Sequence, residues 1–381
     1  MRRSPGPCRR RGVGLYVHLP FCVSRCAYCT FITSTDLALM PRVTAAVARE
    51  IDLMADREPR PLASLYLGGG TPSLVDAAAL GGIFAAVGRS FALKPGAEVT
   101  LEANPDDVTE DRIALWRRLG VTRVSIGCQS FSDRILEMLN RRHSAAQSRS
   151  AAEAVLAAGL TLSIDLMLGL PLMRREELES TLGETLRLRP QHVSVYLLEM
   201  DKPHELARLA ERRPDIFPDA DVSASQFLQA GRTLVAAGYR HYEVSNFALP
   251  GNVARHNTRY WSGLPVLAAG VGAHGQAGRR RWANLAELPA YLEAVARGET
   301  PRAWSRRLAE DEALREAVML GMRQARGVAD ELLHECGAAA PSFAERLADF
   351  LSLGLARRLP GRVRLTPRGW LVSNELLHTL W

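Results

Sequence analysis

The alternation of short apolar runs with helical segments limits the fold of this chain more than any other feature. Strands and helices that alternate at this spacing form βα units, in which helices cover a parallel sheet. We therefore predict an α/β domain with its functional groups where the strands end. The predicted strands are Gly14–His18, Ser64–Leu67, Glu98–Leu101, Arg123–Ile126, Ser163–Leu168 and His192–Leu197. The predicted helices lie near Pro41–Ala55, Ser73–Arg89, Thr109–Leu119, Ser144–Ala158 and Arg174–Leu188.

A cysteine triad directly follows the first predicted strand. Cys22, Cys26 and Cys29 have a C-x3-C-x2-C spacing within LYVHLPFCVSRCAYC. Three thiolates at this spacing can hold three irons of a cubane cluster and leave the fourth iron open, whereas a closed cluster mainly transfers electrons. Phe21 and Tyr28 place apolar rings among the thiols, which suits a cluster that needs shielding from water. The triad therefore favours an iron–sulfur site that performs chemistry.

Disulfides and zinc are the alternatives for these cysteines. An odd number of thiols with no apolar secretory leader before them fits disulfides poorly. A zinc site usually takes four Cys or His ligands, often as two separated pairs. Cys128 and Cys336 have no Cys or His partner at ligand spacing, so we expect both to be small core residues.

On these residues the chain resembles the radical S-adenosylmethionine (SAM) superfamily, from about Leu15 to its C-terminus. In that superfamily such a triad binds a [4Fe–4S] cluster, and SAM chelates the open iron. The run YVHLPFC resembles the branch of oxygen-independent coproporphyrinogen III oxidases and their relatives. The resemblance implies a partial (β/α)6 barrel, a [4Fe–4S] cluster on Cys22, Cys26 and Cys29, and bound SAM.

The resemblance also implies which segments bind SAM. Gly69, Gly70 and Thr71 lie in GGGTP after the second predicted strand, where glycines let backbone approach a ligand closely. This loop would take the methionine amino group of SAM; its alternative is a plain turn. Glu102 follows the third strand and suits a ribose hydroxyl or an ammonium group, with a helix cap as its alternative.

Further polar side chains follow or interrupt the later strands. The amide of Gln129, after the fourth strand, can both donate to and accept from a cofactor. Arg141 resembles the family arginine that grips the SAM carboxylate as a bidentate fork, with Arg142 as its adjacent competitor. Asp165 is an acid inside a strongly apolar strand, where carboxylates are rare unless paired or functional. Two tyrosines are expected to flank the cluster and adenine, with core packing as the alternative: Tyr16 and Tyr28.

Two further motifs concern the branch of the superfamily. The oxidases carry another cysteine two positions after the triad, where this chain has Phe31. The run HNTRYW, which begins at His256, matches the HNxxYW motif of the relatives called HemW, which are haem chaperones. This match implies haem as a ligand, with His256 as the first candidate for the iron and His274 and His18 behind it. The alternative is that His256 and Asn257 form a buried hydrogen-bonding pair that supports the barrel.

We therefore predict a haem chaperone that binds a [4Fe–4S] cluster, SAM and haem and passes haem to client haemoproteins such as respiratory enzymes. The first alternative is an oxygen-independent coproporphyrinogen III oxidase, which abstracts hydrogen from a propionate side chain. The second is a module that contacts nucleic acid through its C-terminal arginines. The net charge of +7 is modest for 381 residues and is mostly arginine, which reflects base composition more than a nucleic-acid surface.

The chain is long enough for one large domain and a smaller one. We expect a disordered basic tail at 1–12, a radical SAM partial barrel at 13–240, an extension with HNxxYW at 241–300 and a C-terminal domain at 301–381. A hairpin at Leu355–Leu365 after two helices makes the last domain resemble a winged helix. The cysteine usage suggests a reducing cytoplasm, with a possible homodimer and at most peripheral membrane contact.

Overall fold

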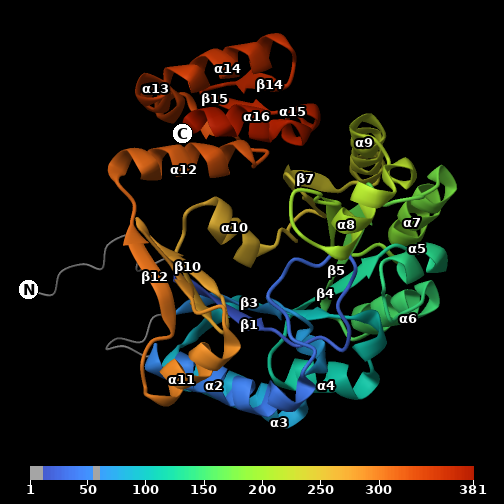
Figure 1. Ribbon diagram of the computed structural model, residues 1–381, viewed down its shortest axis with the longest axis vertical. Helices are drawn as coiled ribbons and strands as arrows, with labels where there is room; N and C mark the ends of the chain where they lie inside the picture. The colour runs from blue at the N-terminus through green and yellow to red at the C-terminus, as the bar shows by residue number, and fades with distance from the viewer. Residues whose placement is uncertain (1–11, 55–60) are drawn as a thin grey trace, which may run out of the picture.

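Twelve strands of the described residues form one sheet, and its middle is parallel (Figure 1). The computed structural model describes residues 12–54 and 61–381, so the predicted tail at 1–12 lies almost wholly outside the described residues. Six parallel strands stand side by side in sequence order. They are β1 (Val13–Leu19), β2 (Leu62–Gly69), β3 (Leu93–Ala103), β4 (Arg123–Gln129), β5 (Thr161–Leu168) and β6 (His192–Leu197). The predicted α/β partial barrel of six βα strands is therefore confirmed.

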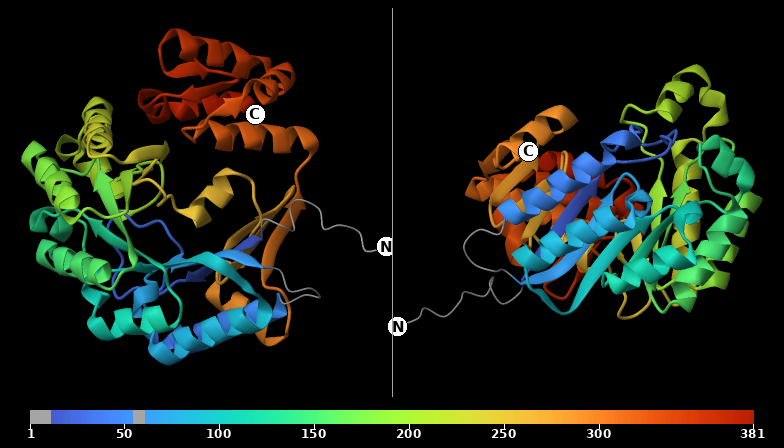
Figure 2. Two further views of the ribbon diagram at one scale, coloured as in Figure 1. Left: turned by 180° about the vertical axis from the view of Figure 1, so that it is seen from behind. Right: turned by 90° about the horizontal axis from the view of Figure 1, so that it is seen from below.

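Helices cover the outer face of these strands, as the apolar spacing predicts (Figure 2). The main helices are α2 (Met40–Leu53), α3 (Ala77–Ser90), α4 (Glu110–Arg118), α6 (Ala145–Ala157) and α7 (Arg175–Leu188). Each begins and ends within a few residues of the predicted bounds; Ala55, the predicted end of the first helix, lies outside the described residues. Their apolar faces pack with alternate strand residues such as Leu15, Leu65 and Ile164 in one continuous core. The short helix α5 (Asp133–Met138) was not predicted.

The inner face of the six strands is polar. Side chains of a strand alternate between its two faces, and the residues between the core positions include Ser64, Thr100, Ser125 and Asp165. Apolar residues on one face and polar residues on the other are why these strands can bury a core and still line a site.

The region from Asp201 to Arg297, where the sequence shows no regular pattern, extends the sheet at both sides. On one side α8 (Glu205–Arg212) and α9 (Ala220–Ala236) precede β7 (Arg240–Glu243) and β8 (Asn246–Ala248), and β8 pairs antiparallel with β6. On the other side β9 (Val266–Ala269) pairs parallel with β1. It is followed outward by β10 (His274–Ala277), β11 (Arg280–Asn284) and β12 (Arg302–Arg307). Several of these strands, such as HGQA of β10 and RAWSRR of β12, lack the apolar runs from which the six parallel strands are predicted.

Two helices of this region complete the extension. The HNxxYW motif forms α10 (Arg255–Trp261), which begins where Glu98 of β3 accepts hydrogen bonds from the backbone N–H groups of Arg255 and His256. Helix α11 (Leu288–Ala296) lies beside α2.

The C-terminal part has a core of its own. Helix α12 (Glu310–Met322) leads through β13 (Val328–Ala329) to α13 (Asp330–Ala339) and α14 (Pro341–Ser352). The predicted hairpin is present as β14 (Ala356–Leu359) and β15 (Arg362–Leu365), and β15 also pairs with β13. The chain closes with α15 (Pro367–Leu371) and α16 (Ser373–Leu377). This winged-helix-like arrangement, drawn at the top of Figure 1, is called the C-terminal module below.

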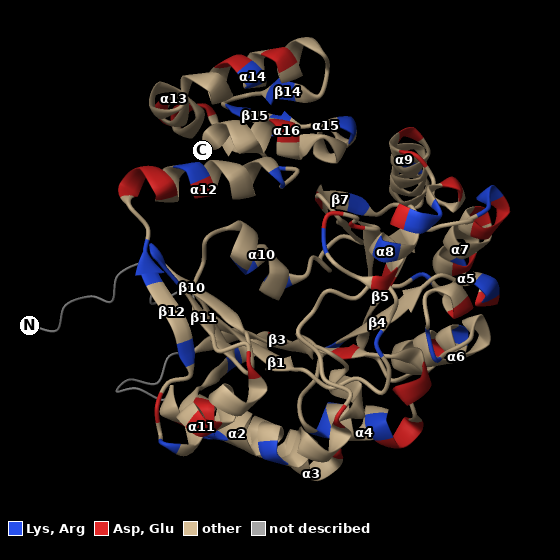
Figure 3. Cartoon of the chain, in the orientation of Figure 1, with Lys and Arg blue, Asp and Glu red and all other residues tan. Residues whose placement is uncertain are grey.

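Charged pairs and backbone bonds attach this module to the sheet. Figure 3 shows the acidic start of α12 directly after the basic end of β12. Arg306 of β12 pairs with Glu312 of α12 at 3.0 Å, and Arg279 pairs with Glu310 at 3.0 Å.

Among the described helices, none is long and apolar enough to cross a membrane.

Candidate functional site

A cavity of about 380 Å³ opens at the C-terminal ends of the parallel strands. This is the edge at which the parallel-sheet prediction places functional groups. Most of the predicted cluster and SAM residues line it together: Cys22, Cys26, Tyr28, Cys29, Gly69, Gly70, Thr71, Glu102, Gln129, Arg141 and Asp165. Its size lies in the range of small-molecule sites.

The three cysteines of the triad are free, partly exposed thiols on the loop after β1. Backbone bonds shape this loop: the N–H of Cys22 donates to the carbonyl of Ser34 at 3.0 Å, and that of Cys29 donates to Cys26 at 3.1 Å. Burial raises the pKa of the Cys22 and Cys29 thiols. In the described part of the chain, no three or more His, Cys, Asp or Glu side chains are grouped around a position for a single metal ion.

Two side chains donate hydrogen bonds to the sulfurs. The Thr71 hydroxyl donates to Cys22 Sγ at 3.4 Å, and Arg141 Nη1 donates to Cys26 Sγ at 3.2 Å. Donors to cysteine sulfur tune an iron–sulfur cluster where one is bound. The donor set therefore fits a cluster on this triad.

Arg141 crosses the cavity between several elements. Its Nη1 also donates to Tyr28 Oη at 3.4 Å, and its Nη2 donates to Asn104 Oδ1 at 2.5 Å and to the carbonyl of Gly127 at 2.8 Å. Its Nε is buried and has no partner among the described residues. Arg142 instead forms ion pairs with Asp106 and Asp107, at 3.0 and 3.3 Å. Of the two adjacent arginines, Arg141 is the one that lines the cavity.

Glu102 ties the glycine loop to the neighbouring strand. It accepts a hydrogen bond from Tyr66 Oη at 2.6 Å and another from the N–H of Gly69 at 3.1 Å. The N–H groups of Gly70 and Thr71 donate to Leu19 and Phe21, at 2.8 and 2.7 Å. These N–H groups are therefore already hydrogen-bonded within the chain, so the loop would bind an amino group through its carbonyl oxygens. Burial, opposed by the Tyr66 bond, raises the pKa of Glu102 to about 7.

Close packing explains why the loop after β2 is glycine. A Cβ on Gly69 would lie 2.5 Å from the His18 ring, and the φ of Gly69, +113°, disfavours other residues. A Cβ on Gly70 would lie 2.6 Å from the Phe21 carbonyl oxygen. The glycines therefore allow the loop after β2 to lie against β1 and the cysteine loop.

Asp165 and Gln129 complete the wall on the side of β4 and β5. The Ser125 hydroxyl donates to both oxygens of Asp165, at 3.3 and 3.2 Å. Burial raises the pKa of Asp165. Gln129 ends β4 with a φ of 63°, a conformation that is uncommon for a residue other than glycine.

Two predicted site residues, Tyr16 and His256, lie outside the cavity lining. Tyr16 Oη bonds to His18 Nδ1 at 3.0 Å, and its ring packs near those of Tyr66 and His256. His256 is buried with only 1% exposed, and its Nδ1 bonds to Ser64 Oγ at 3.0 Å. Its Nε2 is buried without a partner among the described residues. Burial, with Arg259 nearby, lowers the pKa of His256 to about 3.

The other two histidines named as iron candidates differ in exposure. His18 is buried, and its two ring nitrogens bond to Tyr16 and to the Ile32 carbonyl. His274 is exposed on β10, and its ring meets that of Trp304 edge-on with centroids 6.2 Å apart. Asn257 is not the hydrogen-bond partner of the His256 ring; that partner is Ser64.

Several lining residues were not identified from the sequence. Asn104 is the most important, because its side chain accepts from Arg141. It precedes Pro105 at the end of β3, a position that the strand-end rule could have singled out. Tyr196 and Leu197 end β6 in the same way. Lys202 and Met167 also line the cavity, and no motif pointed to them.

Comparison with known proteins identifies the family of the chain. The family model described as the radical SAM superfamily matches residues 16–184, and the model described as the HemN C-terminal domain matches residues 308–372. A relative from Mycobacterium tuberculosis, named heme chaperone HemW, is 36% identical over 96% of this chain and 94% of its own length. A Bacillus subtilis protein of the same name is 30% identical over 95% of this chain and 97% of its own length.

A solved structure shares the fold. The coproporphyrinogen III oxidase (HemN) from Escherichia coli, described as a radical SAM enzyme, has a TM-score of 0.85 over 97% of this chain and 90% of its own, at 21% identity. The full-length similarity to several HemW proteins and the two matched family models lead to one conclusion: this chain belongs to the HemW family of radical SAM proteins.

Proposed function

We propose that this chain is a haem chaperone that binds a [4Fe–4S] cluster, SAM and haem and delivers haem to haemoproteins such as respiratory enzymes. The observation that carries the proposal is one cavity lined by the cysteine triad and by the predicted SAM residues other than Tyr16, in a chain of the HemW family. The same proposal includes client haemoproteins, a possible homodimer, a cytoplasmic location and at most peripheral membrane contact.

Cys22, Cys26 and Cys29 would hold the cluster. When bound, the cluster supplies an iron with an open coordination position for SAM. Thr71 and Arg141 would donate to two of the three thiolates, which favours their charged form. The side chain at the position of the oxidases' further cysteine is Phe31, which is 63% exposed and lines the cavity.

The surrounding residues would hold SAM. Arg141 would bind its carboxylate, and the carbonyl oxygens of Gly69 and Gly70 would accept from its amino group. Glu102 suits a ribose hydroxyl or the amino group. The other expected contacts are Tyr28, Thr71, Gln129 and Asp165, with Tyr16 behind the cavity lining.

An oxygen-independent coproporphyrinogen III oxidase is the second candidate, and the fold shared with HemN favours it. The test is anaerobic reconstitution with iron and sulfide, haem titration, and an assay with coproporphyrinogen, SAM and a reductant. Haem binding without decarboxylated product supports the chaperone. Decarboxylated product would make the chain an oxidase without the usual further cysteine.

Replacing one triad cysteine tests the cluster assignment. We expect Cys26→Ala to lose the reconstituted iron and sulfide while the chain stays folded, because the thiol lies on a loop and is partly exposed. Cys336→Ala is the matched control, since Cys336 is buried in the C-terminal module. Unchanged iron and sulfide in Cys26→Ala would remove the triad as the cluster site.

His256 is the proposed haem ligand that the HNxxYW match implies. We expect His256→Ala to weaken haem binding and leave iron and sulfide unchanged, as read by haem titration and metal analysis. His274→Ala is the comparison variant, because His274 is the exposed member of the candidate set. Identical titration curves for wild type and His256→Ala would exclude His256 as ligand and leave it the buried partner of Ser64.

A further inference from the structure

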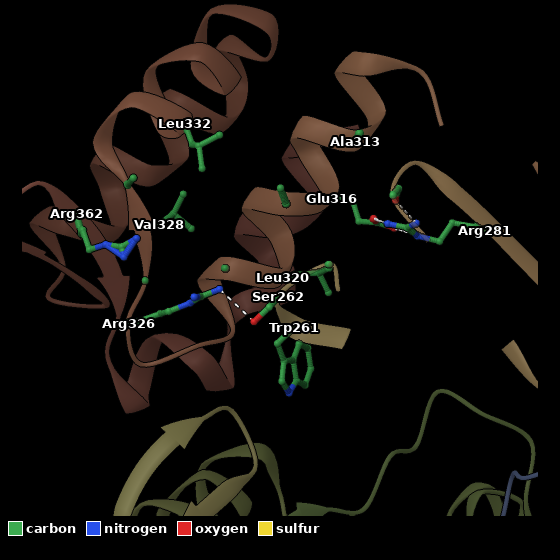
Figure 4. A pocket seen from close by; sticks show the side chains of 16 residues that line it. Trp261, Ser262, Arg281, Ala313, Glu316, Leu320, Arg326, Val328, Leu332 and Arg362 are labelled. Atoms are coloured by element: carbon green, nitrogen blue, oxygen red, sulfur yellow. Dashed lines mark hydrogen bonds and ion pairs between the residues drawn. The ribbon is translucent and has the colours of Figure 1, made fainter. Parts of the chain in front are cut away.

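A second pocket, of about 290 Å³, lies between the extension of the sheet and the C-terminal module (Figure 4). It shares no lining residue with the cluster cavity. One wall is the end of α10 with the β10–β11 turn, and the other is α12 with the segment around β13. The pocket is therefore a separate feature that the site described above does not use.

The walls of this pocket combine apolar side chains with small residues. Trp261, Leu320, Val328 and Leu332 supply the apolar surface, and Figure 4 draws their side chains. Glycine and alanine at the remaining wall positions leave the hollow between the two parts of the chain: Gly263, Gly278, Ala313, Ala317, Gly321, Gly327 and Ala329. Such a surface suits an apolar group.

The charge of the pocket is positive and incompletely balanced. Arg281 is paired with Glu316, the acid among the lining residues. Arg326 donates to Ser262 Oγ at 3.4 Å, and neither Arg326 nor Arg362 forms an ion pair with a carboxylate of the described residues. Burial and the nearby Arg362 lower the pKa of Arg326. Two neighbouring guanidinium groups without a counter-charge favour an anion.

We infer that this pocket receives the propionate edge of haem, with Arg326 and Arg362 binding the carboxylates and the apolar wall contacting the macrocycle. Haem combines these properties: it is flat and apolar, and its two carboxylates lie on one edge. A guanidinium binds a carboxylate in a bidentate fork, and an indole ring packs well against a flat ring system. The inference rests on the proposed haem binding and concerns the propionate edge alone; His256 is not among the residues that line this pocket, so the iron ligand is a separate prediction.

Charge-removing variants test the inference. In the reconstituted full-length protein we expect Arg326→Gln with Arg362→Gln to weaken haem binding about tenfold or more, because each lost charged contact is worth roughly a factor of ten. Arg368→Gln, an exposed arginine of the same module outside the pocket, is the matched control and should titrate like wild type. Iron, sulfide and SAM binding should stay unchanged in all variants.

The dimethyl ester of haem keeps the macrocycle and removes both negative charges, so it distinguishes the contribution of the carboxylates to binding from that of the macrocycle. We expect the affinity of wild type for the ester to be as low as the affinity of the double variant for haem. The two substitutions should not lower the affinity for the ester any further. Ala317→Phe, which fills the pocket and keeps both arginines, should weaken the binding of both haem and its ester. Wild-type affinity for haem in the double variant, or equal binding of ester and haem, would overturn the inference while leaving the proposed function standing. Absence of haem binding in wild type would overturn both.

Discussion

At the scale of single residues, Arg141 joins more parts of the cluster cavity than any other side chain described above. Its guanidinium donates to Cys26, Tyr28, Asn104 and the Gly127 carbonyl. A lysine ammonium in its place has three donors on one atom and cannot reproduce the planar fork. The identity of this residue therefore matters for the geometry of the site as well as for its charge.

We predict that Arg141→Lys reduces the affinity of the reconstituted protein for SAM by about tenfold or more, because lysine cannot make the planar fork that the proposed contact with the SAM carboxylate needs. Equilibrium dialysis with labelled SAM measures this. Arg142→Lys is the matched control, since Arg142 pairs with Asp106 and Asp107 and does not line the cavity. Equal SAM affinity in both variants would contradict the assignment of Arg141.

At the scale of elements, Glu50 of α2 holds three later segments against the barrel. It accepts hydrogen bonds from the N–H of Gly270 after β9 at 2.8 Å, from Asn284 of β11 at 2.7 Å and from Tyr291 of α11 at 2.7 Å. The carboxyl is fully buried, and burial raises its pKa from 4.5 to about 7 against the effect of these bonds. One buried acid thus attaches the extension to the first helix.

This raised pKa makes a pH-dependent stability prediction. The folded state holds the Glu50 proton at pH values where the unfolded chain has released it, so the stabilisation is complete below pH 4.5 and is lost as pH rises towards 7. The loss amounts to about 3 kcal/mol. We expect the urea unfolding midpoint of Glu50→Gln to rise relative to that of wild type between pH 5 and pH 7, because the other buried groups with shifted pKa, such as Glu102 and His256, contribute equally to both chains. Asp52→Asn, at an exposed position of the same helix, should keep the wild-type slope.

At the scale of the whole molecule, the C-terminal module is attached to the barrel through β7. The N–H of Val244 donates to Arg323, and that of Ala325 donates to Tyr242, at 2.9 and 3.0 Å. The His241 ring stacks on Phe247 with centroids 4.0 Å apart and meets Trp370 edge-on at 4.5 Å. The barrel and the module are therefore joined by packing as well as by backbone bonds.

We predict that His241→Ala lowers the stability of the barrel–module junction by roughly 1–2 kcal/mol, because it removes two aromatic contacts. Differential scanning calorimetry should show the transition of the module at a lower temperature. His334→Ala, at an exposed position of the module, is the control. An unshifted transition in His241→Ala would mean that the backbone bonds alone hold the junction.

Sequence patterns were sufficient for the parallel half of the fold and much of the cavity. Short apolar runs located six strands, and the helical patterns between them located five helices. The rule that sites lie at strand ends then placed Cys22, Glu102 and Gln129 near one another. Strands β7 to β12 escaped prediction because runs such as HGQA of β10 and RAWSRR of β12 lack the apolar, β-rich composition of the six predicted strands.

What only the tertiary structure decided concerns residues that are distant in sequence and meet in space. The alternation of apolar and polar residues determined which face of each strand is buried, since that depends on neighbours along the chain. The pairing of Arg141 with Asn104 and Cys26, the burial of His256 against Ser64, and the positive pocket between α10 and α12 depend on contacts across the fold. A single sequence carries the chemistry of each side chain, but the distance between two side chains is set by how all the elements pack.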